Sequence, residues 1–126
     1  MRQDGSATLC TPLLGPTVSV LVCHCACPDQ GTAEAIASRL VEERLAACVQ
    51  ILPPMRSVYR WEGRIEQGTE VLLLAKTSAA AWPALCARIE ALHPYDTPEI
   101  LTLEAASGST GYLDWIHAET GGRAGT

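Results

Sequence analysis

The sequence is poor in basic residues. Its 126 residues hold nine lysines and arginines against fourteen aspartates and glutamates, and Lys76 is the single lysine. Proteins that bind nucleic-acid backbones take much of their affinity from clustered lysine and arginine, so the formal net charge of −5 argues against a nucleic-acid partner. Arg56, Arg60 and Arg64 form a short basic row, which we interpret as a solvated strand face.

Long apolar runs are also absent. The longest, residues 18–23 and 71–75, have the length of a strand and fall well short of the roughly 18 residues that a membrane span needs. Residues 1–17 contain only a brief apolar patch broken by Pro12, which is not typical of a signal-peptide core. We therefore expect no membrane association, a cytoplasmic location, and a flexible N-terminal extension over residues 1–17.

The sequence lacks the motifs of common enzymes. It has no Gly-x-Ser-x-Gly elbow, no phosphate-binding glycine loop and no His-Glu-x-x-His motif. His24 stands beside Cys25, but neighbours on a strand point to opposite faces, so the imidazole is poorly placed to activate that thiol. We predict that the protein is not an enzyme.

Six cysteines would suggest disulfides in a small secreted chain. Here the chain is 48% hydrophobic and can build a core without them, so we interpret the cysteines as reduced thiols. Cys23, Cys25 and Cys27 alternate along one predicted strand and share a face. Residues two apart on a strand lie about 6.6 Å apart, so no disulfide is expected between neighbours in this series.

The predicted elements are strand, helix, two strands of a hairpin, helix, strand and a short final helix. Strands are predicted at residues 18–25, at 48–52 resuming through the hairpin at 59–61, at 70–76 and at 98–105. Helices are predicted from 29 or 32 to about 46, from a cap at 77 or 78 to 92, and after 109. This order predicts an α+β fold, a ferredoxin-like βαββαβ sandwich with a long β-hairpin and a short C-terminal helix.

The predicted fold forms one domain over residues 18–119, followed by a C-terminal tail at 120–126. Two long helices cover only one face of a four-stranded sheet, so the apolar residues of the other face must be buried by something else. Another subunit is the simplest candidate.

Three stretches carry a family resemblance. They are Leu45-Ala46-Ala47-Cys48-Val49, Ser57-Val58-Tyr59-Arg60-Trp61-Glu62-Gly63-Arg64-Ile65-Glu66 running on to Lys76-Thr77, and His93-Pro94-Tyr95-Asp96-Thr97-Pro98-Glu99-Ile100. In the second stretch, Tyr59 and Trp61 share a strand face and Glu62-Gly63 supplies a turn. Together the stretches resemble the CutA family of divalent-cation tolerance proteins over nearly the whole chain.

The resemblance implies a homotrimer that contributes to divalent-metal tolerance, with the sheets packed around a threefold axis and the long hairpin joining neighbours. It places a metal-binding thiol at Cys25 and a histidine at His93. Thiolate is a soft ligand and imidazole a borderline one, so this pair would suit copper, especially cuprous copper. Where copper is ascribed to the family, the histidine end is usually an adjacent pair, whereas Leu92 precedes His93 here.

These residues also have structural interpretations. Cys23 and Cys27 read as core thiols, the alternative being that one of them supplies a second sulfur to the ion. His93 precedes Pro94 at the predicted end of a helix, where it would either bond the last carbonyls or bind metal. The series Cys-x-Cys-x-Cys is not a structural zinc pattern.

A second candidate site follows from the resemblance. Tyr59, Trp61, Lys76, Tyr95 and Glu99 fall on family motif positions and are predicted to line a cleft between subunits. Aromatic walls with one lysine and one carboxylate would recognise a small anionic metabolite, as in a PII-like signalling module. Interface packing with a Lys76 ion pair, and hence a structural trimer without ligand, is the remaining hypothesis.

Overall fold

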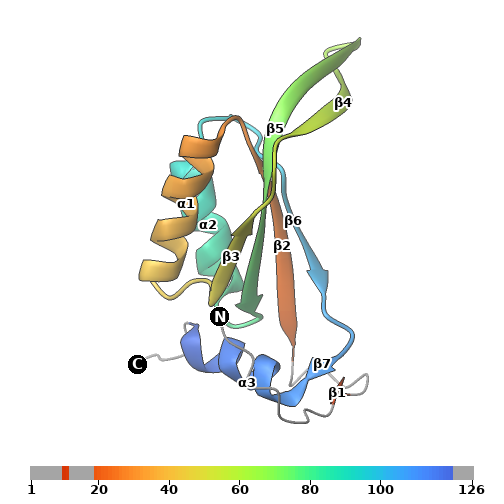
Figure 1. Cartoon of the computed structure of the whole chain (residues 1–126). Helices are drawn as coiled ribbons and strands as arrows, with labels where there is room; N and C mark the ends of the chain where they lie inside the picture. The colour runs from red at the N-terminus through yellow and green to blue at the C-terminus, as the bar shows by residue number, and fades with distance from the viewer. Residues whose placement is uncertain (1–9, 12–18, 121–126) are drawn as a thin grey trace.

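The computed structural model describes residues 10–11 and 19–120. Its elements are β1 (Cys10–Thr11), β2 (Val20–Cys27), α1 (Gln30–Glu42), β3 (Cys48–Ile51), β4 (Met55–Trp61), β5 (Arg64–Ser78), α2 (Trp82–Leu92), β6 (Ile100–Glu104), β7 (Gly108–Ser109) and α3 (Thr110–Glu119). The main sheet is antiparallel with the order β3-β5-β2-β6, and β4 pairs with β5. Helices α1 and α2 lie on one face (Figure 1), so the predicted ferredoxin-like α+β fold is confirmed.

The core lies between the sheet and the two long helices. Alternate residues of β2 and β5 point toward α1 and α2, whose apolar stripes meet them. The largest buried side chains of this cluster are Ile36, Leu40, Leu73, Leu85 and Ile89. Burying such a side chain fully stabilises the fold by about 1.5–3 kcal/mol. A smaller cluster of Val20, Leu113 and Ile116 fixes α3 near the start of β2.

Strand β5 is longer than predicted and takes part in both the hairpin and the main sheet. Its first half pairs with β4 in a hairpin that projects beyond the helices, and its second half pairs with β2 and β3 (Figure 1). The turn is Glu62-Gly63, as predicted, with φ of 49° and 79°. Two positive φ values in a two-residue loop match the twist of the flanking strands, which is why the hairpin closes here.

Helix α1 ends at Glu42, earlier than the predicted end near residue 46. The reason is local, because Arg44 adopts a φ of 60° and turns the chain out of the helix. The N–H groups of Leu45 and Ala46 both donate to the Leu40 carbonyl, so the last turn keeps its hydrogen bonds without continuing the helix.

The predicted cap of the second helix is wrong. Ala81 occupies the N-cap position of α2, whereas Thr77 and Ser78 end β5 and are buried. The Thr77 hydroxyl donates to the Leu45 carbonyl over 2.7 Å, and the Ser78 hydroxyl accepts the Ala81 N–H over 3.3 Å. Burial among these partners keeps both residues in the sheet.

The first strand ends two residues later than predicted, because β2 runs to Cys27. A small sheet of β1 and β7 was not predicted. Apart from β1, the expected N-terminal extension lies outside the described residues, as does the expected tail after Thr120. None of the helices within residues 10–11 and 19–120 has the length and hydropathy to cross a membrane.

The Asp29 cap gives a stability prediction. Its carboxylate accepts the Thr32 N–H over 2.8 Å, and this bond lowers the pKa of Asp29. A lowered folded-state pKa contributes stability that is present above the unfolded-state pKa and is lost as pH falls through the folded-state value. We expect Asp29→Ala to lower the melting temperature by a few degrees at pH 7, and the difference from wild type to shrink below about pH 4. Thermal unfolding by circular dichroism measures it.

Asp29→Asn is the matched variant, since asparagine keeps an acceptor at the N-cap and does not titrate. It is expected to stay close to wild type at pH 7 and to keep its advantage over Asp29→Ala at pH 3, where wild type has lost the ionised cap. A loss in Asp29→Ala that persists unchanged at pH 3 would contradict the assignment of the stability to the ionised cap.

Candidate functional site

Two thiols and an imidazole meet where β2 ends beside the C-terminus of α2. The ligand atoms of Cys25, Cys27 and His93 all lie within 4.8 Å of one another, and the three residues are buried. Cys25 and Cys27 reach this point because β2 alternates, and His93 because α2 ends there as its C-cap residue. Sulfur and nitrogen donors at this spacing form a candidate site for a soft metal ion.

The His93 ring is already held by two hydrogen bonds. The Tyr95 N–H donates to Nδ1 over 3.1 Å, which makes Nδ1 an acceptor and leaves the ring proton on Nε2. Nε2 then donates to the Ala26 carbonyl over 2.8 Å. The ring therefore ties the end of α2 to β2 instead of bonding the last carbonyls of its own helix, and it must give up one of these bonds to bind a metal.

Protonation of the two thiols is unequal. A hydrogen bond with Cys27 raises the pKa of Cys25, and burial raises it further. The same bond lowers the pKa of Cys27. Cys25 therefore stays protonated at neutral pH, and a metal ion that takes its sulfur must displace that proton. Burial raises the pKa of Cys23 to about 12, as expected of a core thiol.

The three cysteines of β2 are free, as are Cys48 and Cys86, so the expectation that neighbours in the β2 series do not pair holds. The structure brings together the two predicted ligands, Cys25 and His93, and adds Cys27. Sequence reasoning left Cys27 between a core thiol and a second sulfur. The alternation of cysteines along one strand was the available signal, but placing Cys27 next to His93 required the position of α2.

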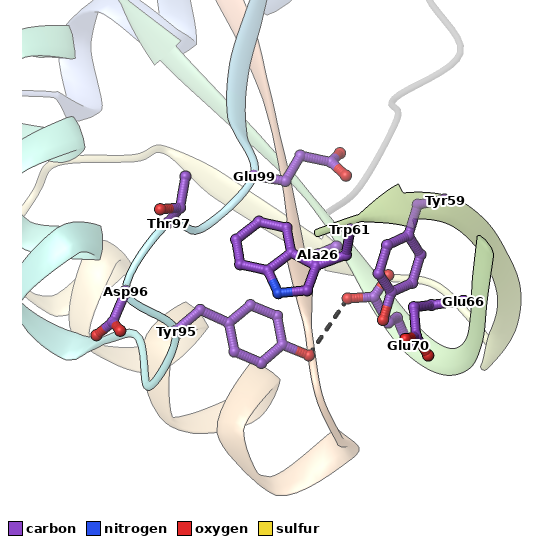
Figure 2. Close-up of a pocket in the computed structure, with 9 residues that line it drawn as sticks. All are labelled: Ala26, Tyr59, Trp61, Glu66, Glu70, Tyr95, Asp96, Thr97 and Glu99. Carbon is purple, nitrogen blue, oxygen red and sulfur yellow. Dashed lines mark hydrogen bonds between the residues drawn. The ribbon is translucent and has the colours of Figure 1, made fainter. Parts of the chain in front are cut away.

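A pocket of about 400 Å³ adjoins this cluster, between the hairpin and the segment that follows α2. Three aromatic rings, those of Tyr59, Trp61 and Tyr95, gather around it in Figure 2. Ala26 lies at its floor, so the pocket and the His93 hydrogen bond share one backbone segment. Four carboxylates also line it, from Glu66, Glu70, Asp96 and Glu99.

Tyr95 connects the pocket to the thiol cluster. Its ring packs on the His93 ring with centroids 4.7 Å apart, and its hydroxyl donates to Glu70 over 3.3 Å (Figure 2). Partial burial and the nearby Glu70 carboxylate raise the pKa of Tyr95. Tyr95 therefore stays a neutral hydrogen-bond donor across the physiological range.

Lys76 does not belong to this pocket. Its ammonium donates to Gln50 over 2.9 Å and lies 3.5 Å from the Tyr112 hydroxyl, against α3 at the other end of the sheet. Within one chain Lys76 and the aromatic residues lie apart, because β5 is long enough to separate them, and the cleft between subunits that would join them stays a prediction. With Lys76 elsewhere, the described lining residues include acids and no base, an arrangement that repels anions.

Comparison with known proteins gives a consistent family. A family model described as CutA1 divalent ion tolerance protein matches residues 21–119. Among curated proteins, the chain is 51% identical over 94 residues to the divalent-cation tolerance protein CutA of Thermus thermophilus, covering 75% of this chain and 91% of that one. It is 44% identical to the CutA protein of Pectobacterium atrosepticum, over 82% of this chain and 94% of its relative.

Solved structures agree. The divalent cation tolerance protein of Thermus thermophilus aligns with a TM-score of 0.80 and 48% identity over 81% of this chain and 99% of its own. CutA from Xylella fastidiosa aligns with a TM-score of 0.79 and 45% identity over 81% and 98%. A protein from Archaeoglobus fulgidus described as periplasmic aligns with 0.77 and 36% over 79% and 97%. This chain belongs to the CutA1 divalent ion tolerance family.

Proposed function

We propose that this protein contributes to divalent-metal tolerance by binding copper in the cuprous state with Cys25, Cys27 and His93. The observation that carries the proposal is the grouping of their three ligand atoms within 4.8 Å. Two sulfurs bridged by one soft metal ion at about 2.3 Å each lie at most about 4.6 Å apart, which is within reach of this spacing. Thiolate favours cuprous copper, and the absence of carboxylates from the cluster disfavours magnesium and calcium.

The three ligands have different roles in the proposal. Cys25 and Cys27 supply the two sulfurs, and Cys27 is the better thiolate because its pKa is lowered. His93 is a third donor, and its ring must give up its hydrogen bond to Ala26 or to Tyr95 before it binds the metal. Breaking one of these hydrogen bonds offsets part of the free energy that the ring nitrogen gains by binding the metal, so His93 contributes less to affinity than either thiol.

A pH dependence of metal binding follows. The raised pKa of Cys25 keeps it protonated at neutral pH, and the metal must displace that proton. We therefore expect the affinity for cuprous copper to rise about tenfold per pH unit between pH 6 and 8, because the release of one proton on binding changes the affinity by a factor of ten per pH unit. An anaerobic titration against a chelator calibrated at each pH measures the slope. A slope of zero would show that the ion does not take the Cys25 sulfur.

We further propose that the protein works as a homotrimer. Helices cover one face of the sheet, and the other face carries apolar residues that no described element covers. Leu101 and Leu103 of β6 are 59% and 55% exposed there, and the half-buried Leu72 and Leu74 lie on the same face of β5, on the other side of β2. A specific interface buries about 800 Å² on each partner, and a continuous apolar sheet face is suited to supply it.

His24 supports the same face as an interface. It lies on β2 opposite Leu74 and Leu101, and its Nδ1 atom is buried without a hydrogen-bond partner in the described part of the chain. A buried polar atom left unpaired costs about 1–3 kcal/mol. We infer that a flip of the ring, which moves Nδ1 to the opposite edge, lets a neighbouring subunit over this face supply the missing partner.

The location proposed is the cytoplasm. Five free cysteines, three of them buried together on β2, persist most readily in a compartment that keeps thiols reduced. A cuprous ion also requires reducing conditions.

A further inference from the structure

The two hydrogen bonds of the His93 ring lead to parts of the fold that differ in rigidity. Nε2 donates over 2.8 Å to the carbonyl of Ala26, a buried residue of β2, and β2 is paired with β5 on one side and β6 on the other. Nδ1 accepts over 3.1 Å the N–H of Tyr95, which lies between α2 and β6 and belongs to neither a helix nor a strand. A strand inside a sheet cannot turn its carbonyl away without breaking ladder bonds, whereas a connecting segment can move. The bond to Tyr95 is therefore the one that can open.

The ring proton decides which nitrogen is free to bind a metal ion. A neutral imidazole carries one proton, and the metal takes the lone pair of the other nitrogen. If Nδ1 is the ligand, the proton stays on Nε2, the bond to Ala26 is kept and only the bond from Tyr95 is lost. If Nε2 is the ligand, the proton must move to Nδ1, where it would face the Tyr95 N–H. Both hydrogen bonds would then be lost, so Nδ1 is the less costly ligand atom.

The Ala26 carbonyl also provides the support that a metal-bound histidine needs. Such histidines usually donate their second N–H to a carbonyl or carboxylate, which fixes the ring and makes the ligand nitrogen more basic. In this protein the bond from Nε2 to Ala26 already exists, and Ala26 stands between the two cysteines of the cluster. The ring is thus oriented before any metal ion arrives.

The Tyr95 side chain keeps its own N–H close to Nδ1. Its ring packs on the His93 ring with centroids 4.7 Å apart, and its hydroxyl donates to Glu70 over 3.3 Å (Figure 2). These two contacts restrain the residue from opposite ends of its side chain. The N–H is therefore a standing competitor for the lone pair that a metal ion would use.

We propose that His93 binds copper through Nδ1 while Nε2–H stays on the Ala26 carbonyl, and that the Tyr95 N–H competes with the ion for Nδ1. This assignment rests on the copper site proposed above and names the ligand atom and the residue that regulates it. Tyr95 is a positioning residue, because it acts through the His93 ring and supplies no ligand atom. Copper binding requires the Tyr95 segment to turn away, and its return favours release of the ion.

The test is nitrogen-15 NMR of the full chain labelled at histidine, reduced and titrated anaerobically with cuprous copper alone, which is diamagnetic. Nε2 couples to both carbon-bound ring protons and Nδ1 strongly to only one, so the two nitrogens can be told apart. The chain has three histidines, and His93→Ala identifies the signals of His93 by their loss. We expect Nε2 to carry the proton before and after copper is added and the Nδ1 resonance to move on binding. The Tyr95 amide proton should exchange faster with solvent in the copper-bound protein.

Tyr95→Pro removes the competing N–H. Tyr95→Ala is its matched control, because it loses the same side chain and keeps the N–H. We expect Tyr95→Pro to bind cuprous copper about fivefold more tightly than Tyr95→Ala, since Nδ1 no longer gives up a hydrogen bond. A merely structural role of Tyr95 would weaken binding in both variants alike. Competition titration measures the ratio, circular dichroism checks the fold, and the wild-type spectra decide the ligand atom if Tyr95→Pro does not fold.

The outcomes separate this assignment from the copper site itself. Transfer of the proton to Nδ1 with movement of the Nε2 resonance would overturn the assignment, as would copper binding that leaves Nδ1 unmoved. In both cases copper is bound, so the thiol site stands. Binding by Tyr95→Pro that is no tighter than by Tyr95→Ala would overturn the competition by Tyr95. Reduced protein that binds no copper would overturn the proposed function and this assignment together.

Discussion

Replacing Cys27 by alanine is expected to weaken binding of cuprous copper by at least about hundredfold, because one of two sulfur ligands is lost. Residues that only hydrogen-bond to metal ligands already contribute about tenfold to hundredfold in affinity, so the loss of a ligand itself should cost at least as much. Cys25→Ala should cost as much. His93→Ala should cost less, since its ring must leave a hydrogen bond to Ala26 or Tyr95 before it binds. The measurement is an anaerobic competition titration of reduced protein against a cuprous chelator.

Cys23→Ala is the matched control for this series. Cys23 lies two residues before Cys25 on the same face of β2 and is equally buried, but it is outside the cluster. It is expected to change copper affinity by no more than about twofold, well under 1 kcal/mol. If Cys23→Ala weakens binding as much as Cys27→Ala, the effect reflects damage to β2 and the assigned ligand set is wrong.

The second large effect is expected on the assembly. Wild-type protein should have a mass near 40 kDa, about three times the 13.4 kDa of one chain. Introducing two charges with Leu101→Glu and Leu103→Glu should reduce it to the mass of one chain, because each carboxylate would have to be buried without a partner at the interface. Size-exclusion chromatography with light scattering gives the mass, and circular dichroism checks that the double variant is folded.

The control for the assembly is Val41→Glu. Val41 is an apolar residue on α1, 43% exposed, on the helical side of the molecule. A new charge there should leave the mass unchanged. A wild-type mass near 13 kDa at micromolar concentration would contradict the trimer. Dissociation caused by Val41→Glu would indicate that the interface lies on the helical side of the molecule.

The sequence by itself determined the fold class, because its signals are local. The apolar run that predicts a strand over residues 18–25, the helical spacing after Asp29 and the Glu62-Gly63 turn each depend on residues a few positions apart. The structure has a strand at Val20–Cys27, a helix from Gln30 and the turn at Glu62-Gly63. The order of these elements then left few topologies. Predictions erred at element ends, where the competing partner is distant: Thr77 is held in β5 by the Leu45 carbonyl and does not cap α2.

The candidate sites depended on tertiary structure. Periodicity placed Cys25 and Cys27 on one face, but only the packing of α2 beside the end of β2 brought His93 to them and occupied both of its ring nitrogens. Likewise, Lys76 and the hairpin aromatics are far apart within one chain, because Tyr59 and Trp61 pair with the first residues of the 15-residue strand β5 and Lys76 lies near its end. Distances between side chains on separate elements are set by packing, which no local pattern encodes.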